Sequence, residues 1–255
     1  MKSTTDIHWN ERAATVKSDI DVNTMDVYQR NLEFDYICKY LGPSMNVLEV
    51  GCGNGISTKQ FRSFVKHVDS FDYSENMIAR AKSTVGETNN RFFVDNVLAP
   101  QHPTKDYDVV ICVRVLINLQ NLEQQLLAIQ NLQTYIRPNG LFILVEGYIE
   151  GFRALSSLRA KVNLPAIEPA KINRYSSIND ILPKLKSYFK LEDEFHLGMY
   201  DFLTRVHYPL VVGIENIKHN TVFSEKSEIL AREINTDAFK EFSRIRGFVL
   251  RKISV

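Results

Sequence analysis

The chain has 255 residues, enough for one domain with a full hydrophobic core, and its 44% apolar and 24% charged residues are typical of a globular protein. Lysine and arginine total 31 against 30 for aspartate and glutamate, so the net charge of +1 gives no electrostatic footprint for nucleic acid or an acidic membrane. The N-terminus has no apolar signal core and the apolar runs are too short to cross a bilayer, so we expect no membrane span.

The three cysteines, Cys38, Cys52 and Cys112, are not spaced like metal ligands or a redox pair. We therefore expect free thiols, no metal site and a reducing compartment, which predicts a cytoplasmic protein. No internal repeat or low-complexity tract divides the chain, so a single domain over 1–255 is expected.

Residues 1–24 are polar and contain Trp9, the only tryptophan. Trp9 could anchor the core or belong to a lid over an active site, and the sequence leaves both open. Residues 25–41 carry apolar and aromatic side chains at helical spacing, and Gly42-Pro43 would end that helix. We expect residues 1–44 to form an N-terminal cap.

The stretch 46–55, Asn-Val-Leu-Glu-Val-Gly-Cys-Gly-Asn-Gly, is the one around which the chain is organised. Its first half predicts a short buried strand, and the three glycines at alternate positions predict a loop. A helical pattern follows over 56–64. Glycines let the backbone turn at positive φ and approach a ligand closely, so this is the opening of a nucleotide-binding α/β unit.

A second strand is predicted over 65–73, with Asp72 near its end. A carboxylate in this position can accept hydrogen bonds from both hydroxyls of a ribose, although Asp72 could instead cap the next helix. That helix is expected over 74–85 and a third strand over 91–94.

The nearly all-apolar residues 107–113 predict a central parallel strand that is buried on both faces. An amphipathic helix over 122–136, a turn at 137–140 and a fifth strand over 141–145 follow. Alternating strands and helices predict a doubly wound, mostly parallel sheet, in which ligands bind at the carboxyl ends of the strands.

The pattern Glu-x-Gly-x-Gly-x-Gly, with Glu49 at the strand end, resembles motif I of class I S-adenosylmethionine (SAM) dependent methyltransferases. The dinucleotide fingerprint is spaced differently, as G-x-G-x-x-G. The resemblance covers 25–148 well and implies a Rossmann-like fold with SAM as cofactor and S-adenosylhomocysteine (SAH) as product. It implies cofactor binding by Glu49, Gly51, Cys52, Gly53, Gly55, Asp72, Tyr73, Met77, Asp95, Asn96, Val97, Cys112, Arg114 and Asn118.

The resemblance also gives some of these residues specific roles. It implies that Met77 packs against the adenine, that the Asp95 carboxylate accepts from its exocyclic amine and that the Asn96 backbone reaches the ring. Arg114 and Asn118 would line the cleft between SAM and the acceptor. For Arg114 a structural ion pair is an equally good reading. Residues 45–148 are thus expected to form the SAM-binding core.

The second half, 149–255, is expected to supply the substrate side and the closing strands. A helix is predicted over 177–188 and strands over 191–197 and 243–253, which fit the antiparallel ending of the methyltransferase sheet. Residues 199–242 would be an insertion between these strands, helical at 224–232.

Methyl transfer to a hydroxyl needs a base to take the proton. The candidates are His8, His207, Glu146 and Tyr148, and of these His207, Glu146 and Tyr148 are taken as catalytic candidates. The sequence does not decide among them.

The expected reaction is methyl transfer from SAM to an oxygen or nitrogen of a small polar acceptor. Segments 158–175 and 200–212 resemble enzymes of surface-polysaccharide or small-metabolite biosynthesis, which suggests a sugar or sugar nucleotide. A SAM-binding assembly or regulatory protein without turnover is the alternative. Glycine spacing disfavours a nicotinamide-dependent oxidoreductase. The sequence Cys-Val-Arg-Val after the fourth strand disfavours a nucleic-acid methyltransferase. No nucleic-acid partner is expected, and a homodimer is compatible with the sequence.

Overall fold

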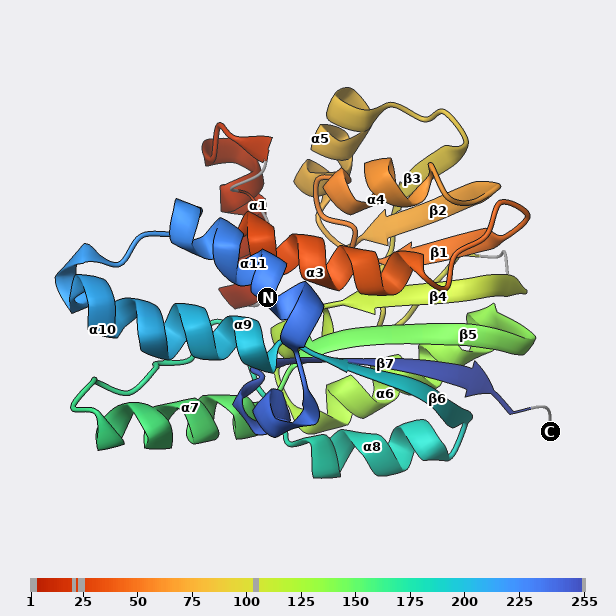
Figure 1. The fold of residues 1–255 in the computed structure, drawn as a ribbon. Coiled ribbons are helices and arrows are strands. Elements are labelled where there is room, and N and C mark those ends of the chain that lie inside the picture. The colour runs from red at the N-terminus through yellow and green to blue at the C-terminus, as the bar shows by residue number, and fades with distance from the viewer. Residues whose placement is uncertain (1–3, 20–21, 23–25, 103–105, 254–255) are drawn as a thin grey trace.

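The computed structural model describes residues 4–19, 22, 26–102 and 106–253, and a seven-stranded sheet lies at its centre (Figure 1). The strands are β1 (Asn46–Val50), β2 (His67–Asp72), β3 (Asn90–Val94), β4 (Tyr107–Val113), β5 (Ile136–Gly147), β6 (Phe189–His196) and β7 (Ile245–Lys252).

The order of the strands in the sheet is β3-β2-β1-β4-β5-β7-β6. The pairs among β1 to β5 are parallel, whereas β7 runs antiparallel to both β5 and β6. This is the doubly wound sheet with an antiparallel last strand that the sequence predicts, so the predicted fold class is confirmed. The order reverses between β1 and β4, which places the ligand crevice there.

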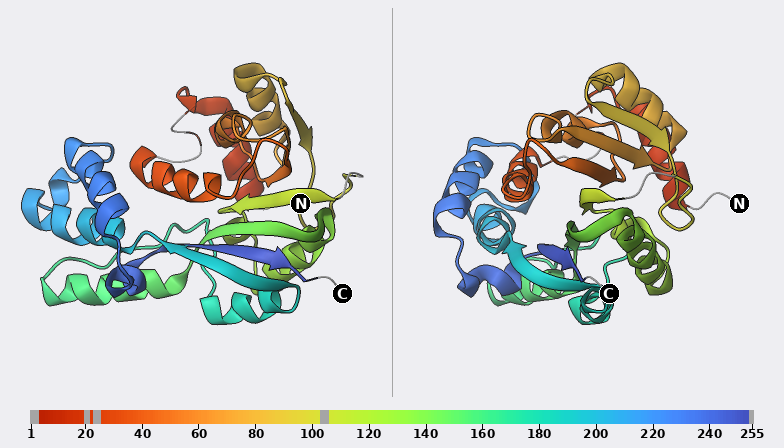
Figure 2. Two further views of the ribbon diagram at one scale, coloured as in Figure 1. Left: turned by 45° about the vertical axis from the view of Figure 1, so that its right-hand side comes forward. Right: turned by 90° about the vertical axis from the view of Figure 1, so that its right-hand side faces the viewer.

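Ten α-helices of the described chain flank the sheet or extend from one end of it (Figures 1 and 2). They are α1 (Thr4–Thr15), α3 (Val27–Cys38), α4 (Ile56–Phe61), α5 (Glu75–Val85), α6 (Leu122–Leu132), α7 (Ile149–Lys161), α8 (Ile178–Lys186), α9 (Gly198–Phe202), α10 (Tyr208–Val212) and α11 (Val222–Ile234). Within the described segments no helix is both long enough and apolar enough to cross a membrane.

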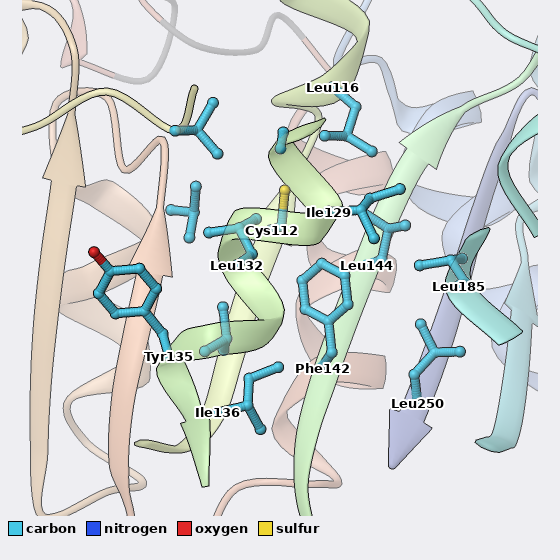
Figure 3. Close-up of a cluster of buried hydrophobic side chains, with 14 of the residues drawn as sticks. Cys112, Leu116, Ile129, Leu132, Tyr135, Ile136, Phe142, Leu144, Leu185 and Leu250 are labelled. Atoms are coloured by element: carbon cyan, nitrogen blue, oxygen red, sulfur yellow. The ribbon is translucent and has the colours of Figure 1, made fainter. Parts of the chain in front are cut away.

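The period of two along the central strands divides the core between the two faces of the sheet. Val109 and Ile111 of β4 belong to the cluster that packs under α3, whereas Val110 and Cys112 belong to the cluster under α6 and α8. Figure 3 shows the second cluster, where Ile129 and Leu132 of α6 and Leu185 of α8 meet side chains of β5 and β7. Burial on both faces explains why these strands are apolar throughout.

Three features of the fold differ from the sequence prediction. Helix α1 forms in the polar N-terminal stretch and helix α7 forms over residues for which the sequence predicts no element. The predicted turn at 137–140 lies inside β5, which begins at Ile136 and is irregular where its partner β4 shifts register between Tyr107 and Val109. Asn139 takes φ +60° there, a value that asparagine tolerates. Met25, the predicted first residue of the helix at 25–41, lies outside the described residues.

The predicted insertion is helical and stands at the end of the sheet where the parallel strands finish. In Figure 1 α9, α10 and α11 extend beyond that edge, and α11 lies beside α3. The Asp201 carboxylate of α9 accepts hydrogen bonds from the backbone and the guanidinium of Arg244, just before β7. The insertion is therefore fastened to the edge of the sheet that carries the functional residues.

Candidate functional site

The glycine loop after β1 has the backbone that its sequence predicts. Gly51, Gly53 and Gly55 have φ of +68°, +53° and +78°, a region that residues with a Cβ atom rarely enter. A Cβ atom on Gly51 would overlap Cγ2 of Val115, and one on Gly55 would lie 2.8 Å from the Phe92 ring. The loop therefore needs glycine both for its conformation and for its close packing.

Asp72 ends β2 beside this loop. One carboxylate oxygen accepts the Gly53 N–H at 3.0 Å, and the other accepts the Ser74 N–H at 2.9 Å. Burial raises the pKa of Asp72 to about 6, and the backbone hydrogen bonds oppose this rise. Each carboxylate oxygen can accept a second hydrogen bond, so two acceptor positions are left. Asp72 can thus hold the loop and still bind a diol.

Glu49, the last but one residue of β1, is buried and ties three elements together. One of its carboxylate oxygens accepts from the hydroxyl of Thr58 on α4 and, at 3.2 Å, from that of Ser70 on β2. Burial raises the pKa of Glu49 to about 7, while both hydroxyls lower it. Its contacts explain an acidic residue in this position even before a ligand is considered.

A cavity of about 300 Å³ opens at the carboxyl ends of β1, β2 and β4. Nine of the predicted cofactor residues line it: Glu49, Gly51, Cys52, Gly53, Asp72, Tyr73, Met77, Arg114 and Asn118. We call the part formed by Glu49, Gly51, Gly53, Asp72 and Met77 the glycine-loop end.

The N-terminal helix covers this end of the cavity. Arg80 of α5 donates to the carbonyl oxygens of Ala13, Val16 and Lys17, just where α1 ends, and so holds the helix in place. Trp9 of α1 lines the cavity and donates its indole N–H to Asn118 at 2.9 Å. Trp9 also packs against the small cluster that contains Met77. Trp9 thus packs against a buried cluster and also lines the cavity, so its position is compatible with both readings.

Hydrogen bonds of the Arg114 backbone position Arg114 and Asn118 in the turn after β4. Arg114 has φ +54°, its N–H donates to Val145, and its carbonyl oxygen accepts from the Asn118 side chain at 2.7 Å. The Arg114 guanidinium lies 3.4 Å from the buried Glu33 carboxylate. Arg114 therefore makes the structural ion pair and also lines the cavity, and its contact with a ligand stays a prediction.

The structure does not bring the other predicted cofactor residues to the cavity wall. The Asp95 carboxylate accepts backbone N–H groups of Asn96, Gln101 and His102 at 2.8 to 2.9 Å and so closes its own loop. The Asn96 N–H, expected to reach the adenine, is thereby occupied. Val97 and Cys112 are buried in the core, and burial raises the pKa of the Cys112 thiol. Gly55 precedes α4, against Phe92.

The three catalytic candidates also lie apart from the cavity wall. Glu146 is 1% exposed and accepts the N–H groups of Val115 and Leu116, both at 2.7 Å, which fixes the turn after β4. Tyr148 is buried against Phe248, and burial raises its pKa. The His207 ring lies 5.9 Å from the Phe223 ring, at an interplanar angle of 34°, in the helical insertion and outside the cavity lining. None of the three described side chains lines the cavity.

The opposite part of the cavity is lined by Arg114, which the sequence predicted, and otherwise by residues that the sequence reasoning missed. We call it the arginine end, and it consists of Gln29, Arg30, Arg114, Asn173, Tyr175 and Arg244. A signal for Arg244 was present, because an antiparallel last strand begins where the parallel strands finish. The residue that precedes β7 must therefore lie beside the end of β5, where Ile245 pairs with Gly147.

Buried polar contacts join the arginine end into one network. The Arg244 guanidinium donates to Asp201 at 2.6 Å and to the Gln29 side chain at 3.2 Å. Gln29 in turn donates to Glu33 at 2.8 Å, and Glu33 pairs with Arg114. The carboxylates of Asp201 and Glu33 are almost completely buried, at 0% and 2% exposure, and do not line the cavity. The cavity surface here accordingly has guanidinium donors without a carboxylate, together with the amide and hydroxyl groups of Gln29, Asn173 and Tyr175.

Comparison with known proteins gives a family match and a fold match. Residues 23–188 match the model of a methyltransferase domain family. A ubiquinone biosynthesis O-methyltransferase of Rickettsia akari (strain Hartford) is 30% identical over 101 residues, 39% of this chain and 39% of that protein. A malonyl-[acyl-carrier protein] O-methyltransferase of Ilyobacter polytropus is 26% identical over 173 residues, 63% of each chain. The chain thus matches between about two fifths and two thirds of the length of these relatives.

One solved structure extends the likeness to the whole chain. It is the N-methyltransferase NodS from Bradyrhizobium japonicum WM9 in complex with SAH, with a TM-score of 0.62 and 12% identity. The match covers 99% of this chain and 100% of that one. At 12% identity this match supports the fold alone.

Proposed function

The chain belongs to the methyltransferase domain family, and on that premise we propose that it transfers a methyl group from SAM to an oxygen or nitrogen of a small polar acceptor. The observation that carries the proposal is one cavity with two unlike ends. At the glycine-loop end the wall contains the carboxylates of Glu49 and Asp72 and glycine backbone. At the arginine end it contains the guanidinium donors of Arg30, Arg114 and Arg244. Such a division suits a cationic nucleoside beside a polar acceptor.

The residues at the glycine-loop end fit SAM. A Cβ atom on Gly51 would overlap the Val115 side chain, which also lines the cavity, so glycine is needed here to keep this part of the wall in place. The two carboxylate oxygens of Asp72 match the spacing of the two ribose hydroxyls, and the buried side chain of Met77 offers an apolar contact for the adenine. When bound, SAM supplies a methyl group on a positively charged sulfur, which is already activated for transfer.

The protein would then contribute mainly position and exclusion of water. Alignment of two reactants can supply on the order of 7–11 kcal/mol of the barrier. Trp9 and the helix that bears it cover the cavity, and Asn173 and Tyr175 offer amide and hydroxyl groups to an acceptor. A sugar or sugar nucleotide is one acceptor that such groups could bind.

The test is SAH formation. The protein would be incubated with SAM and a panel of sugars, sugar nucleotides, organic acids, phenols and amines, and SAH would be measured by mass spectrometry. We expect SAH to form with at least one acceptor class above the rate without acceptor. Tight SAH binding by calorimetry without turnover of any acceptor would instead support the alternative of a SAM-binding protein that acts as an assembly or regulatory partner. The polar arginine end favours turnover.

A further inference from the structure

The arginine end presents cationic and neutral donors from separate elements. Arg30 comes from α3, Arg114 from the turn after β4 and Arg244 from the residue just before β7, and all three line the cavity. The carboxylates of Asp201 and Glu33 lie behind the wall and hold two of these guanidiniums in fixed orientations. A fork of rigid guanidiniums matches the two oxygens of a carboxylate better than it matches a neutral hydroxyl.

The same wall lacks histidine and carboxylate side chains, the groups that most often accept a proton near neutral pH, whereas phenols ordinarily keep their proton there. Of the described residues at the arginine end, none is histidine, lysine, aspartate or glutamate, and the Tyr175 hydroxyl already accepts from Asn173 at 2.9 Å. The carboxylates that do line the cavity, Glu49 and Asp72, lie at the glycine-loop end and are held by Thr58, Ser70 and backbone N–H groups.

A hydroxyl or ammonium acceptor has a proton that must leave, so an enzyme for such an acceptor needs a base within hydrogen-bond reach. Carboxylic acids have ordinary pKa values near ~4 and are already ionised at neutral pH. A carboxylate is therefore a nucleophile that could be methylated at this wall without a base.

We propose that the acceptor is a small carboxylic acid, which the enzyme converts to its methyl ester; this inference rests on the function proposed above. One carboxylate oxygen forms the bond to the methyl carbon as the bond from that carbon to sulfur breaks, and the electron pair of the broken bond stays on sulfur. A carboxylate and a sulfonium thus become a neutral ester and a neutral thioether, and no proton moves. The neutral ester loses its attraction to Arg244 and Arg114, which favours its release.

Binding is the first readout, and it needs no turnover. Calorimetric titrations of the SAH-loaded protein would use benzoate, butyrate and malonate, each with its uncharged amide as the matched control. We expect at least one carboxylate to bind at least tenfold more tightly than its amide. The double variant Arg244→Gln, Asp201→Asn removes the guanidinium without leaving a buried charge unpaired, and should lose this preference while it keeps SAH affinity. Arg153→Gln, an exposed arginine of α7, is the control that should keep it.

The chemical nature of the product is the second readout. With SAM labelled in the methyl group, an ester releases volatile labelled methanol in mild alkali, whereas an ether or an N-methyl product does not. Alkali-labile label would support the inference. Alkali-stable label, or equal affinity for every acid and its amide in a protein that binds SAH, would overturn it while leaving the proposed function intact. Failure to bind SAH at all would overturn the proposed function, and this inference with it.

Discussion

Replacement of Glu146 separates a positioning role from a catalytic one. The sequence made Glu146 a candidate base, but its carboxylate accepts the N–H groups of Val115 and Leu116 at 2.7 Å and that of Ile117 at 3.4 Å. In Glu146→Gln the amide oxygen can still accept the two shorter hydrogen bonds. We therefore expect methyl transfer within about threefold of the wild type, whereas loss of a catalytic base typically costs about 10²–10⁴-fold.

Glu146→Ala should behave differently from Glu146→Gln. It leaves the two well-bonded N–H groups without a buried acceptor, and each such group costs about 1–3 kcal/mol, so the free energy of unfolding should fall by about 2–6 kcal/mol. Urea denaturation followed by circular dichroism measures this loss, and kcat measured alongside it gives the effect on turnover.

The pH dependence gives a further check on Glu146. Burial raises its pKa to about 8 in the folded protein, above the ordinary value near 4.5. Its contribution to stability is thus fully present below about pH 4.5 and is lost as the pH rises through about 8. Glu146→Gln should flatten the stability profile across this window. A Gln variant with wild-type stability and a kcat lowered a hundredfold would refute the positioning role.

Three other predictions concern the cavity walls. Gly51→Ala should lower SAH affinity at least tenfold, as measured by calorimetry. The backbone at φ +68° costs a residue with a Cβ atom about 1–2 kcal/mol, and Val115 must move. Unchanged affinity would contradict the claim that the loop backbone contacts the ligand. SAH affinity should fall as the pH drops below about 6, where Asp72 takes up a proton; a flat titration between pH 5 and 8 would argue against its contact with ribose. Asp201→Asn should lower the free energy of unfolding by about 1.5–3 kcal/mol in urea, since it removes the charged acceptor of the hydrogen bonds from Arg244, whose side chain is 15% exposed. A loss under 1 kcal/mol would show that the pair is dispensable.

The sheet could be predicted from the sequence because the patterns that specify its strands and loops lie within a few consecutive residues. The apolar runs of β1 and β4 and the alternate glycines after β1 each determine the backbone directly, and the structure confirms the fold class. Helix α1 was missed because its apolar side is narrow. Its contacts include those from Arg80, which lies 67 residues away from its partner Ala13, and from Tyr73 to Thr5, and contacts of that kind leave no local pattern.

The candidate site divides in the same way. The glycine-loop end comes from consecutive strand ends, so the motif was enough to name Gly51, Gly53 and Asp72 as cavity residues. The arginine end joins α3 to the residue just before β7 through a contact between Gln29 and Arg244, which lie 215 residues apart. The burial of the Asp95 and Glu146 carboxylates within their own turns depends on tertiary contacts, which a motif does not encode.

The most direct test of the central claim is calorimetric titration of SAH into the wild-type protein and Asp72→Ala, with the exposed Glu75→Ala of α5 as the matched control. Two hydrogen bonds from ribose hydroxyls to a carboxylate are worth about 2–4 kcal/mol, so Asp72→Ala should weaken SAH binding by roughly thirtyfold or more. Glu75→Ala should bind like the wild type. Equal affinities in all three proteins would contradict the claim that this cavity holds the nucleoside through Asp72.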